Sequence, residues 1–334
     1  MPAVSVVIPL FNKGPHIGGT LRSVLAQTVE DVEVIVVEGG STDEGPEVVR
    51  GFRDPRIRMI HAGRRGASAA RNAGIEAASS DLVAFLDADD EWMPRHLEVI
   101  LGLRERYPCA GLYATGYTIR EGSKTRVASL SPEIPPAPRD GLIRNYFLAA
   151  IRGDPPVMTS AVAVPRQVLV ELGGFNTAAW YGEDVDLWGR IALRYPVALS
   201  RKITAVYHKE ALNRACSRRE PIEEHVFVAT AKRAIEGGEV PPALREDLLE
   251  YVASRSIQTA FRNLEAGRPD LARANLKGCR TRRLWKLKYW ALLWAYLPPG
   301  AYRALEPQGM IEWYNGWRER VRGLDRSATR GREG

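Results

Sequence analysis

Cysteine is scarce in this sequence, and its first residues lack the pattern of a secretion signal. Cys109, Cys216 and Cys279 lie far apart among 334 residues, and no two of them have the spacing of metal ligands. This argues against a disulfide framework or a zinc site and favours a reducing compartment. Because no basic stretch leads into an apolar segment near Met1, we expect no signal peptide. The hydrophobic content of 45% allows a sizeable core in one large or two modest domains.

An excess of either charge is missing from the first 277 residues, which contain 35 basic and 35 acidic side chains. The net charge of +7 therefore comes from the segment that follows, where 12 basic residues accompany 5 acidic ones. A basic C-terminal segment points to an anionic partner, either a membrane or a nucleic acid. We favour the membrane and expect no nucleic acid, because nothing resembles a recognised binding module and the acidic cluster near residue 88 repels phosphates.

Strand and helix patterns alternate through the first third of the chain. Continuous Val/Ile runs separated by helices predict an α/β fold, in which helices cover both faces of a mostly parallel, Rossmann-like sheet. Right-handed crossovers place the carboxyl end of every parallel strand at one edge. We expect strands at 4–8, 32–37, 57–60 and 82–86, and helices at 15–27, around 48–49, at 67–78 and at 94–107.

The rest of the chain divides near residue 220. Up to that point we expect strands at 109–117 and 159–164, a loop at 131–138, a helix at 183–195 and short strands near Val197 and Ile203. After Pro221 the pattern is helical to the end, with breaks at Gly237-Gly238, Pro269 and Pro298-Pro299. The sequence thus predicts an α/β domain at 1–220 and a helical C-terminal region at 221–334.

Three carboxylates follow the fourth predicted strand, in the run Leu82 to Asp90. Asp87 and Asp89 are two residues apart, so their side chains share a face if the strand geometry persists. Open α/β sheets bind ligands outside the carboxyl ends of their strands, and two carboxylates there suit Mg²⁺ or Mn²⁺ with a bound diphosphate. The alternative is a solvated acidic turn in which Asp90 caps the helix that begins near Pro94.

Polar and glycine-rich segments follow the first two strands. Asn12 lies just beyond Pro9, and Glu38-Gly39-Gly40-Ser41 follows the second strand; glycines there let backbone N–H groups approach a nucleotide, although ordinary turns use the same residues. Arg71 lies in a helix of small residues that permits close packing. It can bind phosphate or pair with a carboxylate of the acidic cluster, unless it is simply a surface charge.

A second acidic pair follows two aromatic residues. Trp180 and Tyr181 can stack on a sugar, and Glu183 or Asp184 can act as a general base next to it. The alternative is that acidic residues are merely favoured in a first helical turn by the helix dipole. His208 follows the last predicted strand, where it either contacts a diphosphate or an acceptor or is structural.

Six motifs follow one another along residues 3 to 210, and together they are highly specific. They are Val4-Ser5-Val6-Val7-Ile8-Pro9 with Asn12, Gly39-Gly40-Ser41-Thr42-Asp43, Ser68-Ala69-Ala70-Arg71-Asn72-Ala73-Gly74, Phe85-Leu86-Asp87-Ala88-Asp89-Asp90, Gly173-Gly174-Phe175 and Gly182-Glu183-Asp184-Val185-Asp186-Leu187-Trp188. In this order they resemble the inverting family-2 glycosyltransferases of the A-type fold.

The resemblance implies a role for each matching residue. Asp87 contacts the donor nucleotide, Asp89 holds Mn²⁺ or Mg²⁺ on its diphosphate, and Asp184 is the catalytic base, with Glu183 the alternate. Pro9, Glu38 and Arg71 fall where the family surrounds the base and ribose. One departure is Gly39, which stands where the family often has a second aspartate that binds the uracil edge. A uridine diphosphate sugar is still the expected donor.

The motifs together with the basic C-terminal segment give an expected acceptor and place of action. The expected reaction is transfer to a hydroxyl of a glycan or lipid-linked glycan in cell-surface polysaccharide synthesis, at the cytoplasmic face of the membrane. Transfer to a polyprenyl phosphate, whose nucleophile needs no base, is one alternative. A nucleotide-sugar-binding protein without catalysis is the other, because fold alone does not fix function.

The basic C-terminal segment contains five of the eight tryptophans of the chain. A helix over 284–297 would be roughly 21 Å long, too short for a hydrocarbon core of about 30 Å. Trp285, Trp290 and Trp294 with their basic flank instead predict a helix that lies in the headgroup region. Trp313 and Trp317, followed by three arginines, suggest a second such helix. The alternative is that these aromatics pack on the catalytic domain or on a second subunit.

Overall fold

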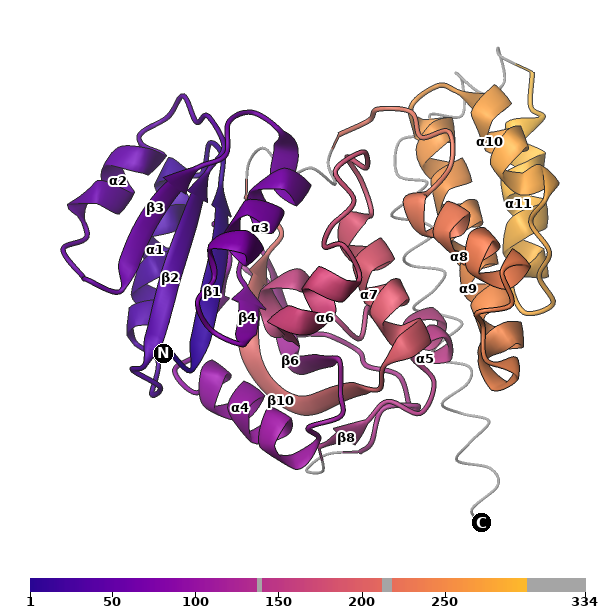
Figure 1. Cartoon of the computed structure of the whole chain (residues 1–334). Helices are drawn as coiled ribbons and strands as arrows, with labels where there is room; N and C mark the ends of the chain where they lie inside the picture. The colour runs from indigo at the N-terminus through magenta and orange to yellow at the C-terminus, as the bar shows by residue number, and fades with distance from the viewer. Residues whose placement is uncertain (137–139, 212–217, 299–334) are drawn as a thin grey trace. The chain divides into compact units, whose positions relative to one another are not determined.

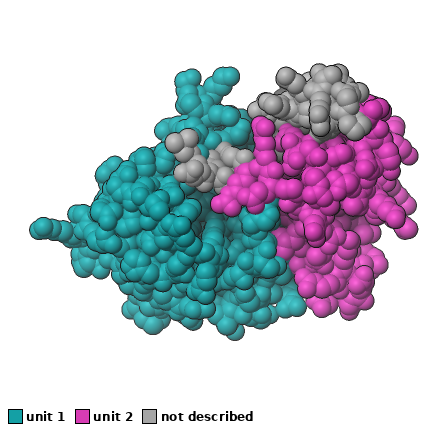
Figure 2. Space-filling view, turned by 90° about the horizontal axis from the view of Figure 1, so that it is seen from above, with its two compact units in different colours: residues 1–149, 154–216 teal, residues 150–153, 217–334 magenta. Residues whose placement is uncertain are grey.

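The computed structural model describes residues 1–136, 140–211 and 218–298. Cys216, the end of the predicted loop at 131–138 and the predicted helix around Trp313 and Trp317 lie outside the described residues. The chain divides into two compact units: residues 1–149 with 154–216, and residues 150–153 with 217–334. Figure 2 shows them in teal and magenta.

Unit 1 is built on a ten-stranded sheet within the described residues, with the order β3-β2-β1-β4-β9-β6-β10-β5 and with β7 and β8 paired to β6 and β10 (Figure 1). The strands are β1 (Val4–Leu10), β2 (Val32–Glu38), β3 (Ile57–His61), β4 (Leu82–Phe85), β5 (Glu91–Trp92), β6 (Leu112–Glu121), β7 (Lys124–Val127), β8 (Gly141–Leu142), β9 (Val162–Pro165) and β10 (Val197–His208). The helices are α1 (Gly14–Leu25), α2 (Gly45–Gly51), α3 (Gly66–Ala77), α4 (His96–Arg106), α6 (Arg166–Glu171) and α7 (Glu183–Arg194), with a 3₁₀ turn, η1 (Thr159–Ala161); α5 (Tyr146–Arg152) begins in this unit. The predicted α/β class with a mostly parallel sheet is confirmed.

The first four strands along the chain pair in parallel, in the spatial order β3-β2-β1-β4. The strand order reverses at β1, which has β2 on one side and β4 on the other. Ligands of open α/β sheets bind at such a switch point, outside the carboxyl ends of the strands. The segments that follow β1 and β4 therefore frame the expected site.

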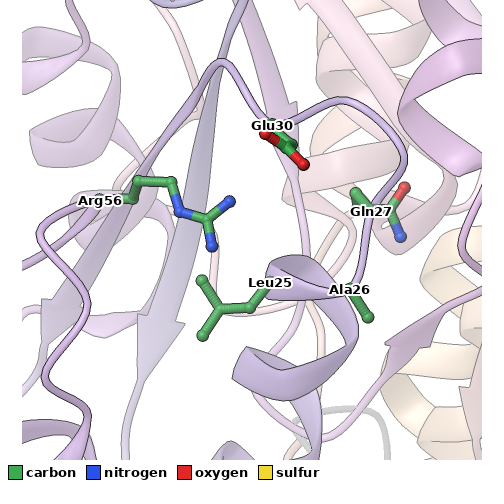
Figure 3. A pocket seen from close by; sticks show the side chains of 5 residues that line it. All are labelled: Leu25, Ala26, Gln27, Glu30 and Arg56. Atoms are coloured by element: carbon green, nitrogen blue, oxygen red, sulfur yellow. The ribbon is translucent and has the colours of Figure 1, made fainter.

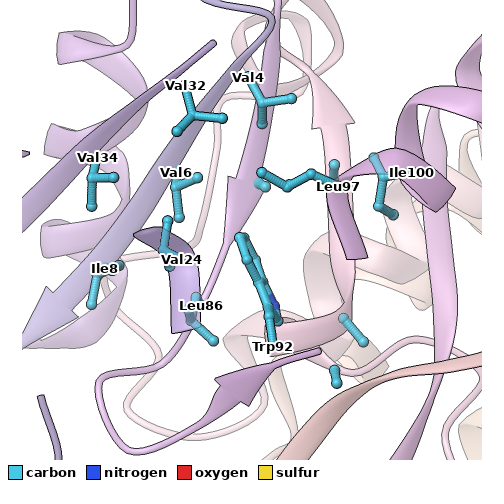
Figure 4. Packing of buried hydrophobic residues seen from close by; sticks show 14 of the residues in the cluster. Val4, Val6, Ile8, Val24, Val32, Val34, Leu86, Trp92, Leu97 and Ile100 are labelled. Atoms are coloured by element: carbon cyan, nitrogen blue, oxygen red, sulfur yellow. The ribbon is translucent and has the colours of Figure 1, made fainter. Parts of the chain in front are cut away.

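The core of unit 1 follows from the alternation of side chains along β1. Val4, Val6 and Ile8 are fully buried in a cluster that also includes residues of β2, α1 and α4 (Figure 4). Val7, which lies between Val6 and Ile8, has its side chain on the other face of the sheet, against α3. A Cβ added to Gly74 of α3 would lie 2.3 Å from Cγ1 of Val7. Only glycine lets α3 approach the sheet this closely, which is the close packing that the small residues predict.

Three local differences from the sequence expectations have simple causes. β1 continues through Pro9 to Leu10. This is possible because β4 pairs with β1 only as far as Val7, so Ile8 to Leu10 pair on one side only, with β2. The predicted strand at 159–164 begins as the turn η1 and is extended only from Val162. The two short strands near Val197 and Ile203 are one strand, β10, whose register shifts between Ser200 and Ala205.

The strand β4 ends at Phe85, and the chain turns where Asp90 N–H donates to the carbonyl of Asp87. Asp87 and Asp89 therefore lie beyond the strand, so strand geometry does not place their side chains on one face. Asp90 is fully buried and does not cap α4, whose N-cap residue is Arg95. The alternative of a solvated turn with Asp90 as a cap is wrong.

Unit 2 contains the helices α8 (Val226–Glu236), α9 (Pro242–Glu265), α10 (Pro269–Lys277) and α11 (Trp285–Ala295). Ala253, Ile257, Phe261, Leu276 and Leu287 belong to a buried cluster shared by α9, α10 and α11. The fully buried Asn263 binds the backbone N–H and C=O of Ile222 at 2.8 and 2.7 Å and thereby fixes the chain before α8. Across the described residues, every helix is too short or too polar to cross a bilayer.

Candidate functional site

Lys13 and Asp89 meet at the switch point of the sheet. Lys13 follows the end of β1, and its Nζ lies 2.6 Å from Oδ2 of Asp89, which follows β4. Both side chains are nearly buried, at 11% and 12% exposed. An ion pair that is screened so little by solvent is held more firmly than one on the surface. The carboxylate that the sequence assigns to a metal is therefore balanced by a cation of the protein.

Arg71 joins the two acidic segments. Its Nη2 donates to Oδ1 of Asp87 at 2.8 Å, and its Nη1 donates to Oε1 of Glu183 at 2.9 Å. The side chain of Arg71 is only 6% exposed, and its guanidinium lies 5.2 Å from the ring centroid of Phe175. Of the roles that the sequence allows for Arg71, pairing with a carboxylate of the acidic cluster is the one present here. One buried cation thus connects the end of β4 to the start of α7.

The electrostatics of this network follow from burial. Burial alone would lower the pKa of Arg71, but Asp87 and Glu183 outweigh it and raise that pKa above the ordinary value. Burial and the neighbouring Asp184 carboxylate raise the pKa of Glu183, although Arg71 acts in the opposite direction. The pKa of Glu183 is thus raised above its ordinary value even though its carboxylate accepts from Arg71.

Asp184 lies next to Glu183 in the first turn of α7 but has different partners. Its Oδ2 accepts from Oγ1 of Thr159 at 3.3 Å, and its Oδ1 accepts from the backbone N–H of Val185 at 2.7 Å. α7 begins after Gly182, whose φ of 77° is in the left-handed region that glycine tolerates. This sharp entry places two consecutive carboxylates in the first turn of the helix.

Asp90 has a structural role beside the site. Its carboxylate accepts from the hydroxyl of Ser160 at 2.5 Å and from the backbone N–H of His208 at 2.9 Å. Burial, followed by the charges of Asp87 and Asp89, raises the pKa of Asp90 well above its ordinary value. The Oγ1 of Thr20 donates to the carbonyl groups of Ala88 and Asp90. These bonds hold the acidic turn rigidly against β10 and η1.

The loops after β1 and β2 bind each other. Asn12 adopts a φ of 50°, its backbone N–H donates to Oγ of Ser41 at 3.1 Å, and its Oδ1 accepts from the N–H of Thr42 at 2.8 Å. Oε1 of the buried Glu38 accepts from the Ser41 N–H at 2.5 Å. Burial would raise the pKa of Glu38, but the N–H groups of Ser41 and Gly40 lower it below the ordinary value, so Glu38 is a fixed carboxylate. Gly40 has a φ of 84°, and Pro9 lies in β1 just before these loops.

The remaining predicted residues lie at the ends of β10 and before α7. His208 is the last residue of β10, and its Nδ1 lies 3.2 Å from Oε1 of Glu210. Through its backbone it contacts Asp90, so it is near the acidic turn. Trp180 and Tyr181 are partly exposed, with ring centroids 5.6 Å apart and planes inclined at 46°. They form an aromatic surface directly before Glu183.

A pocket of about 500 Å³ lies at the opposite edge of the sheet (Figure 3). It is lined by Leu25, Ala26, Gln27, Glu30 and Arg56, from the end of α1 and the segments before β2 and β3. None of the residues that the sequence assigns to catalysis or donor binding lines it. Ligands of parallel sheets bind at the carboxyl edge, so we do not regard this pocket as the catalytic site.

The acidic turn fits a cation that is shared with a substrate. Asp87 and Asp89 are oxygen donors, which Mg²⁺ and Mn²⁺ prefer. Within the described ranges, no cluster of three or more His, Cys, Asp or Glu residues encloses a metal. Mg²⁺ commonly binds through one or two carboxylates plus the phosphates of a substrate, without an all-protein cage. The two aspartates match that pattern.

Sequence reasoning missed several residues of this network. Lys13 was not singled out, although a lysine directly after the Asn12 loop is the only indication that the sequence offers. The sequence pattern predicts Thr159 and Ser160 as strand residues, and nothing in it places them against Asp184 and Asp90. His61 pairs with β2 and has its Nδ1 3.3 Å from Oε2 of Glu38. These contacts depend on the order of strands in the sheet.

Comparison with known sequences places the N-terminal part of the chain. The family model described as glycosyl transferase family 2 matches residues 5–157. The uncharacterized glycosyltransferase YibD of Escherichia coli K12 is 40% identical over 100 residues, which are 29% of each chain. An Escherichia coli protein named UDP-Glc:alpha-D-GlcNAc-diphosphoundecaprenol beta-1,3-glucosyltransferase WfaP is 31% identical over 135 residues, 40% of this chain and 54% of that protein. The chain spans between 27% and 64% of the length of four such relatives.

Comparison with solved structures identifies the fold. The structure of S. aureus TarS 1–349 in complex with UDP-GlcNAc is similar, with a TM-score of 0.65 at 16% identity over 93% of this chain and 92% of that one. The mannosyltransferase PcManGT of Pyrobaculum calidifontis, in complex with GDP-Man and Mn²⁺, gives a TM-score of 0.56 at 22% identity over 91% of this chain and 83% of that one. Residues 5–157 thus match glycosyl transferase family 2, the family that the motifs resemble, and the chain has the fold of these solved structures.

Proposed function

We propose that this protein transfers a sugar from a nucleoside diphosphate to an acceptor hydroxyl with inversion at the anomeric carbon. The observation that carries the proposal is the buried Arg71, which binds Asp87 from the end of β4 and Glu183 from the start of α7. This cation ties a donor-binding segment to a segment that carries a candidate base, at the switch point of the sheet. We assign the transferase domain to residues 1–220 and treat 221–334 as the accompanying helical region.

The donor half of the site consists of the loops after β1, β2 and β4. In this assignment Pro9, Asn12, Gly40 and Ser41 surround the nucleoside with Glu38, and Asp87 contacts the nucleotide. Asp89 and Asp87 would hold Mn²⁺ or Mg²⁺, which when bound stabilises the negative charge that develops on the leaving nucleoside diphosphate. Asp89 is paired with Lys13 at 2.6 Å, so it would serve the metal only with the ammonium of Lys13 displaced, and a diphosphate beside the turn would offer that ammonium a new partner.

The acceptor half lies at the start of α7. A hydroxyl is a weak nucleophile, so a carboxylate must remove its proton as it attacks the anomeric carbon. Asp184 suits this role because Arg71 engages Glu183, whereas Asp184 accepts, among the described residues, from a hydroxyl and a backbone N–H. Trp180 and Tyr181 provide a surface on which an acceptor sugar stacks, and His208 contacts the diphosphate or the acceptor. A base on the attacking side and a metal on the leaving side give a single displacement with inversion.

We propose a uridine diphosphate sugar as the donor. Support comes from the UDP-GlcNAc complex of TarS and from the name of WfaP, which includes UDP-Glc. Gly39 lacks the carboxylate that many family members place here, and a Cβ at this position would lie 3.3 Å from the carbonyl oxygen of Leu10. The backbone of Gly39 is therefore close to β1, and recognition of the nucleotide base falls to Glu38 and its neighbours.

We further propose a glycan or lipid-linked glycan as the acceptor, used in cell-surface polysaccharide synthesis at the cytoplasmic face of the membrane. The name of WfaP contains a diphosphoundecaprenol-linked sugar, which supports a lipid-linked acceptor here. Such an acceptor is confined to a bilayer, so the enzyme must work at a membrane surface.

The Asp89→Ala variant tests the metal part of this function. Loss of one charged oxygen donor should lower the affinity for UDP in the presence of Mn²⁺ by at least about tenfold, while UDP binding without metal changes little. Calorimetric titration with and without Mn²⁺ measures both values. Asp81→Ala, an exposed aspartate before the other end of β4, is the matched control and should bind as the wild type does. Activity that survives both Asp89→Ala and chelation would contradict the metal role.

A further inference from the structure

The helix α11 is apolar on two opposite sides. Its residues Leu287, Ala291 and Ala295 are buried in the cluster shared with α9 and α10. On the other side lie Trp285, Tyr289, Leu293 and the C-cap residue Tyr296, whose exposed fractions are 50%, 64%, 60% and 69%. Spacings of four, four and three residues place these side chains on a single helix face. We call these four residues the outward face of α11.

The sequence pattern predicts lipid contact for Trp290 and Trp294 as well as for Trp285, but of these three only Trp285 belongs to the outward face. Trp290 and Trp294 are partly buried and pack on the helical cluster, with ring centroids 5.3 Å apart. They contribute to the core of unit 2. The side chains available to a partner are therefore the outward face, and its aromatic members Trp285 and Tyr289 contact each other edge to face at 6.1 Å between centroids.

Basic side chains surround this apolar face. Lys286 is exposed, and its Nζ lies 5.6 Å from the ring centroid of Trp285. The guanidinium of Arg273 lies 5.3 Å from the ring centroid of Tyr296. Arg280 is exposed just before the helix. The side chain of Arg282 is 90% exposed and lies 3.6 Å from Glu246, which is also exposed, at 70%. Arg283 differs, because it is paired with Asp247 at 2.7 Å.

We propose that the outward face of α11 lies in the headgroup region of a bilayer that contains anionic lipid. Aromatic residues with polar edges and long basic side chains are the residues that favour this region, where rings enter the acyl boundary and cations meet lipid phosphates. A protein partner is less well matched, since lysine is depleted from the cores of protein interfaces. Eleven residues span only about 16 Å, so the helix lies along the surface.

This inference extends the proposed function from the reaction to the place where it occurs, and it rests on α11 alone. Its test uses no donor or acceptor, so failure here leaves sugar transfer untouched, and failure of sugar transfer leaves the lipid contact untouched.

Co-sedimentation of the full-length protein with vesicles tests the proposal. Wild-type protein should bind vesicles of phosphatidylcholine and phosphatidylglycerol in a ratio of roughly three to one far better than pure phosphatidylcholine. Tyr289→Gln with Leu293→Gln should lower the partition coefficient by at least about tenfold at low and high salt alike. Arg280→Gln with Lys286→Gln should weaken binding at low salt only, since salt screens the charge term. Leu249→Gln, at an exposed leucine of α9, should change nothing.

A second measurement does not depend on the glutamine variants, so a loss of their stability cannot affect it. Lipids that carry bromine on their acyl chains should quench part of the tryptophan fluorescence, and Trp285→Phe should bind equally while losing that part. The proposal is overturned if the wild type ignores the mixed vesicles or if Trp285→Phe leaves the quenching intact. It is also overturned if light scattering shows a dimer that the Tyr289→Gln, Leu293→Gln protein does not form, because the face is then a subunit contact.

Discussion

Replacing Asp184 with Asn should lower the rate of transfer to a hydroxyl acceptor by about 10²- to 10⁴-fold, the range that a general base contributes. An amide cannot accept the acceptor proton, yet Asn preserves the volume, its Oδ1 still accepts from the Val185 N–H, and its Nδ2 can donate to the Thr159 hydroxyl in place of the present bond. Affinity for the nucleotide-sugar should stay within about twofold of the wild type, because the donor loops are unchanged. Steady-state kinetics with calorimetric donor binding separates these two effects.

Glu183→Gln is the matched control for Asp184. It removes an acidic partner of Arg71, so it should weaken donor binding and stability more than it slows the proton transfer itself. A larger loss of turnover in Glu183→Gln than in Asp184→Asn would make Glu183 the base. If Asp184→Asn transfers normally to a phosphate acceptor, the nucleophile is already anionic and the polyprenyl phosphate reaction is the correct one. If no acceptor reacts with any variant or with the wild type, the protein only binds nucleotide-sugars.

Arg71→Met should destabilise unit 1 by about 3 kcal/mol, because it leaves the carboxylates of Asp87 and Glu183 without their buried cation. Met has a similar length and lacks the charge, so the cost comes chiefly from the unpaired carboxylates. Chemical denaturation at pH 7 measures this difference. Arg71→Lys keeps one charge but cannot reach both carboxylates with separate nitrogens, so it should be intermediate. Arg50→Met, which breaks an exposed pair with Glu47, should change stability little.

The deficit of Arg71→Met should shrink as the pH falls. Burial and Asp184 raise the folded-state pKa of Glu183, and loss of Arg71 raises it further. A carboxyl group with a raised folded-state pKa favours the folded state when it is protonated. Its contribution is complete below the unfolded-state pKa and is lost as the pH rises through the folded-state value. Stability of the variant relative to the wild type should therefore increase from pH 7 toward about pH 5; an unchanged or larger deficit would show that Glu183 is not the buried partner that matters.

The parallel half of the sheet was predictable because its strands contain continuous apolar runs such as Val34 to Val37, buried on both faces. The edge that carries the site followed from the same pattern, since crossovers align the carboxyl ends of parallel strands. The close packing of α3 on the sheet was also predictable from its small residues. A side chain at Gly74 would collide with Val7. In each case the information is local or repeats with a fixed period.

Other features depend on contacts between distant segments and have no local signal. Arg71 and Glu183 are separated by 112 positions in the sequence, and Lys13 and Asp89 by 76. Which cation serves which carboxylate is decided by strand order, which places β9 between β4 and β6. The outward face of α11 was misjudged for a related reason. Trp290 and Trp294 look available in the sequence, and only packing against α9 and α10 reveals that Tyr289 and Leu293 are the exposed ones.

The central claim is that the carboxyl edge of the sheet binds a nucleotide-sugar together with a divalent cation. Thermal melting of the full-length protein with a panel of nucleotide-sugars, each with and without Mn²⁺, tests it directly. A ligand that binds only the folded state at a hundred times its dissociation constant adds about 2.7 kcal/mol to stability. We predict that a uridine diphosphate sugar with Mn²⁺ gives the largest rise in melting temperature, and that Mn²⁺ alone gives little. A larger rise with guanosine or thymidine diphosphate sugars would correct the donor, and no rise with any nucleotide-sugar would contradict the claim.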